Sequence, residues 1–109
     1  MATLIWTEPA VTDLDQIADY IATDNPRAAA RLVKRVVEHV TLLEQHPELG
    51  PRIPELLPGS RYRQVVEPPC RVFYRYDKAT KRVYILAVMR SERLFEPELV
   101  QERDVEGQG

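Results

Sequence analysis

The sequence predicts an α+β fold with the element order β-α-α-β-β-β, in which an antiparallel helical hairpin packs on a small antiparallel sheet. A short apolar run at the N-terminus is followed by two amphipathic helical segments, and a proline-rich stretch then leads to three β-prone segments. Helices that precede a group of strands are typical of the α+β class, whereas regular alternation would indicate a parallel α/β sheet.

The N-terminal segment Thr3 to Trp6 is predicted to be a strand that leads directly into a helix. Thr7 is expected to provide a hydroxyl cap, with Glu8 and Pro9 in the first turn, where an acid and a proline are favoured. Apolar residues recur at three- and four-residue steps, which predicts one buried face. The apolar set is Val11, Leu14, Ile17, Ala18 and Ile21, and the residues expected to face away are Asp13, Asp15, Gln16 and Asp19.

A second and longer helix is predicted after Asn25 and Pro26, with Asn25 as its cap. Its buried stripe is predicted to consist of Ala29, Leu32, Val33, Val36, Val37, Val40 and Leu43, and Pro47 marks its end. Because the turn between the two helices is short, we expect an antiparallel hairpin whose shared apolar stripe is covered by the sheet.

Residues 47–59 contain four prolines and two glycines, which predicts an irregular connector. Its apolar residues Leu49, Ile53, Leu56 and Leu57 are expected to pin it to the body. Strands are predicted from Arg61 to Glu67, from Cys70 and from Arg82, with a bend at Pro68-Pro69. One domain over residues 1–95 is expected, followed over residues 96–109 by a short helix (97–103) and a mobile acidic tail.

Two of the predicted strands carry arginines at alternating positions. Because side chains two residues apart share one face of a strand, Arg71, Phe73 and Arg75 are expected on one side of the sheet. The other side would carry Val72, Tyr74 and Tyr76. One face can then serve the core while the other meets a partner.

The length and composition limit which kinds of protein the chain can be. With 109 residues, one cysteine and two histidines, the chain is expected to form one soluble domain without an internal disulfide, a structural metal site or a cofactor. It has no apolar run near the roughly 20 residues of a membrane span and no secretory pattern at its start, so we expect a cytoplasmic protein with no membrane contact.

The charges are distributed unevenly along the chain. Its net charge is −2, which argues against tight non-specific binding of nucleic acid by the chain alone. Between Arg52 and Arg93, however, eight arginines and two lysines face only four acids, whereas five acids and one arginine follow from Glu96 onward. A cationic region flanked by acidic ends is therefore expected.

The element order, together with the segments YRQVVEPPCRVFYRYD and VYILAVMRSERLF, resembles the ParE/RelE superfamily of toxins from type II toxin–antitoxin systems over roughly residues 3–95. The recurrent pattern of that superfamily is an arginine followed by apolar and tyrosine residues on the third strand, and a basic cluster at the end of the fourth. Here the matching segments are Arg71-Val72-Phe73-Tyr74 and Arg90-Ser91-Glu92-Arg93. The long paired helices are more similar to the ParE branch.

The resemblance to the ParE branch implies a toxin that inhibits DNA gyrase by binding it and that is neutralised by a cognate ParD-like antitoxin. It also implies a hetero-oligomer with this antitoxin, and contact with operator DNA only through it. The alternative that the superfamily offers is a RelE-like, ribosome-dependent mRNA endoribonuclease. Such an enzyme needs positioned acid–base groups and cations around the phosphate.

No catalytic set is expected from the residues. His39 and His46 belong to the second helix and its end, and we expect His39 to lie away from the sheet end where a nuclease site of this superfamily would sit. Leu94 and Phe95 occupy the region where many nuclease members carry a tyrosine or histidine. Glu92 could act as a base, but its place between Ser91 and Arg93 favours an ion pair.

The candidates for binding the target or the antitoxin are Arg63, Arg71, Arg75, Arg90 and Arg93. As a group they can engage an acidic partner. The alternative is that they lie on a solvated face or pair with Glu67 and Glu92, which would contribute roughly 0–1 kcal/mol for each exposed pair. Cys70 is expected to be an inert, small side chain.

Overall fold

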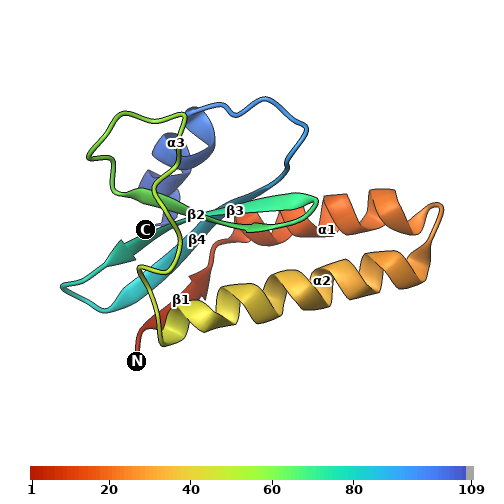
Figure 1. Cartoon of the computed structure of the whole chain (residues 1–109), viewed down its shortest axis with the longest axis horizontal. Coiled ribbons are helices and arrows are strands. Elements are labelled where there is room, and N and C mark those ends of the chain that lie inside the picture. The colour runs from red at the N-terminus through yellow and green to blue at the C-terminus, as the bar shows by residue number, and fades with distance from the viewer. Residues whose placement is uncertain (108–109) are drawn as a thin grey trace.

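The computed structural model describes residues 1–107 and confirms the α+β fold. Its elements are β1 (Thr3–Trp6), α1 (Glu8–Ala22), α2 (Pro26–Thr41), the 3-10 turn η1 (Leu42–Glu44), β2 (Tyr62–Glu67), β3 (Cys70–Asp77), β4 (Arg82–Arg90) and α3 (Glu98–Gly107). Figure 1 shows α1 and α2 side by side as an antiparallel hairpin against the sheet, with α3 on the far side of the strands.

The sheet has the strand order β1-β4-β3-β2, so the first strand of the chain pairs with the last. β1 runs parallel to β4, whereas β2, β3 and β4 form an antiparallel meander. At the β2 edge the connector continues the pairing, because the Gln64 amide donates to the Pro51 carbonyl at 2.9 Å. That edge is therefore partly closed to other strands.

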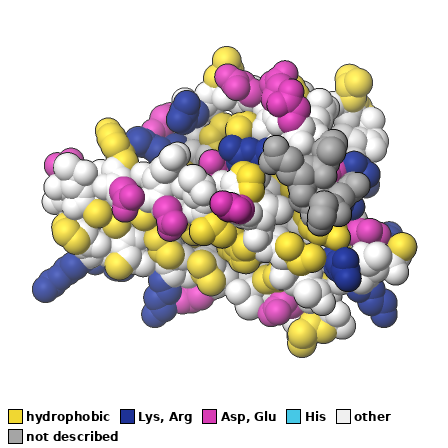
Figure 2. Space-filling model, turned by 180° about the vertical axis from the view of Figure 1, so that it is seen from behind, with side chains coloured by type: hydrophobic (Ala, Val, Ile, Leu, Met, Phe, Trp, Pro, Cys, Tyr) yellow, Lys and Arg dark blue, Asp and Glu magenta, His cyan; other side chains and the backbone are white. Residues whose placement is uncertain are grey.

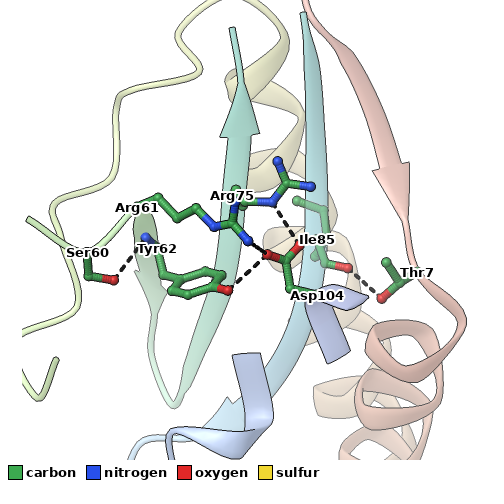
Figure 3. Close-up of polar contacts among 7 residues, drawn as sticks. All are labelled: Thr7, Ser60, Arg61, Tyr62, Arg75, Ile85 and Asp104. Atoms are coloured by element: carbon green, nitrogen blue, oxygen red, sulfur yellow. Dashed lines mark hydrogen bonds and ion pairs between the residues drawn. The ribbon is translucent and has the colours of Figure 1, made fainter. Parts of the chain in front are cut away.

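Both helix starts lie where the sequence predicts them, but only one is capped by a side chain. Asn25 Oδ1 accepts a hydrogen bond from the Ala28 amide at 3.0 Å, as an N-cap should. The predicted hydroxyl cap at Thr7 is wrong, because Thr7 Oγ1 donates instead to the Ile85 carbonyl at 2.7 Å, which ties the end of β1 to β4 (Figure 3).

The first core lies between the helical hairpin and the sheet. The helices contribute Leu14, Leu32, Val36 and Val40, and the strands contribute Val65, Val72, Tyr74, Val83 and Ile85. The predicted stripe of the second helix is confirmed at most positions, but Val37 is 41 % exposed and points away from this core. Val11 of α1 is also exposed. Both residues lie at the margins of their stripes, where periodicity alone predicts more burial than the structure shows.

A second core covers the opposite face of the sheet, so the expectation that one face stays open for a partner is wrong. Phe73, Tyr84, Leu86 and Met89 of the strands pack there against Ile53 of the connector and against Phe95 and Val100. The alternation itself is confirmed, since Val72 and Tyr74 face the helices and Phe73 faces this second core. An irregular register in the β3–β4 pairing places both Leu86 and Ala87 on the second face.

The connector is pinned less completely than predicted. Ile53 is buried and Leu56 packs against the second core, but Leu49 is half-exposed and Leu57 is 84 % exposed.

The helix after residue 96 is longer than the predicted 97–103, and the end of the expected mobile tail, residues 108–109, lies outside the described residues. None of the described helices combines the length and the apolarity needed to cross a membrane.

Candidate functional site

Arg75, one of the five candidate arginines, is part of the second core. Only 5 % of it is exposed, its Nε donates to Asp104 Oδ1 on α3 at 2.8 Å, and its guanidinium lies over the Tyr84 ring. The same carboxylate accepts a hydrogen bond from the Tyr62 hydroxyl at 2.9 Å and one from Arg61 (Figure 3). Arg75 is therefore a buried docking point for α3, inaccessible to a partner while that helix is in place.

Arg71 holds the connector on the same face of the sheet. Its two terminal nitrogens donate to the two carboxylate oxygens of Glu55 at 2.8 and 2.7 Å, and its Nε donates to Gln64. These hydrogen bonds from Arg71 lower the pKa of Glu55 below its ordinary value. The guanidinium also lies over the rings of Phe73 and Phe95.

Arg63, on β2, also binds the connector, near its start. Its Nη1 donates to the Gly50 carbonyl at 2.8 Å, and its Nη2 lies 3.6 Å from a carboxylate oxygen of Glu48. Three of the five candidates, Arg63, Arg71 and Arg75, thus make internal contacts that fix the connector or α3. The structure does not bring all five arginines together on one face.

Arg90 and Arg93 lie elsewhere, beside a cleft of about 410 Å³ between α1, the end of β4, the loop after it and α3. The guanidinium of Arg90 lies 4.7 Å from the centre of the Tyr20 ring on α1 and forms the expected ion pair with Glu92. Arg93 is exposed, and its amide donates to the Arg90 carbonyl at 3.0 Å. In Figure 1 the loop after β4 leaves the sheet close to α1.

Asp13 lines this cleft and is hydrogen-bonded to β4, so its predicted orientation away from the body is wrong. Its Oδ2 accepts hydrogen bonds from the Val88 amide at 3.0 Å and from Arg103 of α3. The ion pair holds α3 against α1 and β4. Among the described residues, no three histidine, cysteine or acidic side chains gather closely enough to hold a metal ion.

His39 does not lie away from the sheet end, which corrects a prediction. Its Nδ1 is 3.2 Å from Glu67 Oε1, and Glu67 is opposite Cys70, which is in turn opposite Arg90. Glu67 also pairs with Arg35 at 3.5 Å. Glu67 therefore pairs with α2 and not with the strand arginines, and neither His39 nor His46 lines the cleft.

Cys70 is buried, with Glu67 opposite it on one neighbouring strand and Arg90 opposite it on the other. Burial raises the pKa of its thiol above the ordinary value, which keeps the sulfur protonated and unreactive at neutral pH.

The cleft beside Arg90 and Arg93 combines cations with exposed apolar groups. Sequence reasoning missed two of its residues, Tyr20 and Leu94. In the sequence, Tyr20 lies off the predicted apolar stripe of its helix and Leu94 directly follows the basic cluster, and a large apolar residue outside the predicted core was the available signal. In the structure the two side chains are 65 % and 87 % exposed.

The molecular surface has no large region of one charge sign on the face seen in Figure 2. Acidic and basic side chains alternate there with exposed hydrophobic ones. A partner is therefore not attracted to this face by a broad cationic field, and specific pockets must provide the recognition.

Comparison with known proteins places this architecture among bacterial toxins. The sequence model of a family described as "ParE toxin of type II toxin-antitoxin system, parDE" matches residues 4–95. The protein named Toxin RelE2 from Caulobacter vibrioides is 34 % identical over 94 residues, which cover 86 % of this chain and all of that protein.

Solved structures agree with this similarity. A chain in the structure described as "Chromosomal ParDE TA system from P. aeruginosa" is 34 % identical, with a TM-score of 0.67. The match covers 84 % of this chain and 98 % of that one. A chain of the toxin–antitoxin complex RelBE2 from Mycobacterium tuberculosis is 22 % identical, with a TM-score of 0.56, and covers 82 % of this chain and 96 % of that one. The second likeness concerns the fold alone.

Proposed function

The chain belongs to the ParE toxin family of type II toxin–antitoxin systems, and from this premise we propose that it arrests growth by binding DNA gyrase in the cytoplasm. In this proposal the protein acts without chemistry of its own, as a binding inhibitor. A cognate ParD-like antitoxin neutralises it, and the pair contacts operator DNA through the antitoxin.

The observation that carries this proposal is the composition of the cleft at the end of β4. It presents Arg90 and Arg93 beside the exposed apolar side chains of Tyr20 and Leu94, a combination typical of protein-binding surfaces. Neither histidine lines it. The match of the ParE toxin family model to residues 4–95 supports the ParE branch. The identities to a chain of a ParDE system and to Toxin RelE2 are equal at 34 % and do not separate the two branches.

A RelE-like ribonuclease is the second candidate, and one contact favours it. His39 and Glu67 form a hydrogen-bonded pair at the same end of the sheet as Arg90, and a pair of this kind can act as a general base. Both side chains are partly buried, however, and Glu67 is also paired with Arg35, which is the pattern of a structural tie between α2 and the sheet.

The two functions separate in a paired experiment with the purified chain. Supercoiling of relaxed plasmid by gyrase is measured in one arm, and the integrity of messenger RNA in a translation extract is measured in the other. Binding inhibition predicts loss of supercoiling with intact transcripts. Cut transcripts together with unaffected supercoiling would overturn the proposal, and loss of cutting in a His39→Ala variant would then assign the base.

A further inference from the structure

We propose that the cleft beside Arg90 holds the toxin on its protein target by taking an apolar side chain of the target next to a single carboxylate. The inference rests on the proposed function, since it names the contact through which a binding toxin would engage gyrase. Its basis is the combination of apolar walls, a guanidinium held by Tyr20 and Glu92, and one guanidinium without an ion-pair partner within residues 1–107.

Tyr20 on α1 and Leu94 on the loop after β4 both line the cleft. With 65 % and 87 % of their surfaces exposed, they contribute little to the folded core. Large apolar side chains of this kind around a cleft of about 410 Å³ offer a place for one or two side chains of another protein. Tyrosine and arginine, together with tryptophan, are also the residue types enriched among those that dominate binding energy at interfaces.

Arg90 lies against one of these walls, the ring of Tyr20. Its guanidinium lies over the Tyr20 ring, where the ring attracts the cation, and Glu92 pairs with it from the loop. The contact with Arg90 on one face of the Tyr20 ring therefore orients this ring before a partner binds. A partner side chain gains contact with it without having to order it first.

The charges around the cleft define what accompanies the apolar side chain. Asp13 is paired with Arg103, and Arg90 is paired with Glu92. Of the charged residues that line the cleft, Arg93 and Glu96 have no ion-pair partner among the described residues. One carboxylate of the partner can reach Arg93, whereas Glu96 would repel an acidic run.

Alanine variants at the two walls test this assignment. Tyr20→Ala and Leu94→Ala are each expected to weaken gyrase inhibition and growth arrest by at least about tenfold, with an unchanged melting temperature. Tyr20→Phe, which keeps the ring, is expected to recover most of the loss. Leu57→Ala is the matched control for Leu94, because Leu57 is 84 % exposed and lies on the connector outside the cleft.

The role of Arg93 is tested by reversing its charge. Arg93→Glu is expected to lose activity at least as strongly as the alanine variants, whereas Arg82→Glu is not, because Arg82 begins β4 and Arg90 ends it. Full activity of Tyr20→Ala and Leu94→Ala would overturn the inference. Loss of antitoxin binding by these variants with unchanged growth arrest would also overturn it, and would assign the cleft to the antitoxin.

The parent protein separates failure of this inference from failure of the proposed function. If the parent arrests growth without inhibiting gyrase, the gyrase proposal fails. Loss of growth arrest in the Tyr20 and Leu94 variants would then still support the cleft as the surface that meets a different protein target. A parent that neither arrests growth nor inhibits gyrase would contradict both.

Discussion

Asp104 on α3 and Arg75 on β3 form an ion pair in which the carboxylate oxygen lies 2.8 Å from Nε and both side chains are almost completely buried. Tyr62 and Arg61 donate to the same carboxylate, so its hydrogen-bonding capacity is largely satisfied. A buried charge is tolerated only with such partners, because removal from water costs several kcal/mol for each ion. The position of α3 therefore depends on the presence of one carboxylate.

Asp104→Ala is expected to destabilise the protein by about 3–5 kcal/mol, because it leaves the Arg75 guanidinium buried without a counter-charge. Urea denaturation followed by circular dichroism measures this loss. Glu102→Ala on the exposed side of the same helix is the control and is expected to stay within about 0.5 kcal/mol of the parent. Equal stabilities of the two variants would show that α3 does not depend on this ion pair.

The stripe of α2 is tested by a pair of neighbouring substitutions. Val36→Asp is expected to unfold the domain, because Val36 is fully buried and an unpaired charge there costs several kcal/mol against a total stability of roughly 5–15 kcal/mol. Leu32→Asp should behave in the same way. Val37→Asp, at an exposed position one residue away, is expected to melt close to the parent in a thermal scan, and cooperative melting of all three near the parent temperature would refute the assigned core.

Gly50 is required for a close approach between the connector and β2. A Cβ atom at this position would lie 2.1 Å from the Gln64 carbonyl oxygen, so Gly50→Ala must displace backbone. We expect a loss of about 1–3 kcal/mol in denaturant titration. Gly59→Ala is the comparison, since its added Cβ meets nothing within 4 Å and only its φ of +91° opposes the change. A smaller loss at Gly50 than at Gly59 would contradict the crowding.

Stability is also expected to depend on pH through Glu55. The hydrogen bonds from Arg71 lower the pKa of this carboxyl below 4.5 in the folded state, so the unfolded state takes up its proton first as the pH falls. The contribution is present above about pH 4.5 and is lost as the pH falls through the folded-state pKa. Because Glu55 is partly exposed, it amounts to less than about 1 kcal/mol.

The measurement for Glu55 compares the parent with Glu55→Gln at several pH values. The parent is expected to be the more stable protein at neutral pH, with a difference that shrinks as the solution is acidified toward about pH 3. A difference that grows on acidification would have the wrong sign for this contact.

Local patterns predicted the elements well, because helix periodicity and caps depend on neighbouring residues. Asn25 and the stripe through Leu32, Val36 and Val40 are examples. The double-sided burial of the sheet could have been recognised from the continuous apolar run between Val83 and Met89, which is typical of strands covered on both faces. The alternating arginines in β3 instead indicate a strand with one solvated face, which is why the sequence alone predicts an open side of the sheet.

The site could be predicted only in part, because its contacts join residues far apart in the chain. Arg90 and Arg93 were identified by their basic pattern, but Tyr20 meets Arg90 only because α1 crosses the end of β4. Similarly, Glu55 and Asp104 neutralise Arg71 and Arg75 from segments expected to be irregular or mobile. Sequence spacing carries no information on such pairings.

The most direct test of the central claim is gyrase supercoiling in the presence of the parent protein and of the Arg90→Ala/Arg93→Ala double variant, both shown to be folded. The account predicts that the parent inhibits supercoiling and that the double variant, with its fold intact, needs at least about tenfold more protein for the same effect. Equal inhibition by the two proteins, or no inhibition by the parent, would contradict it.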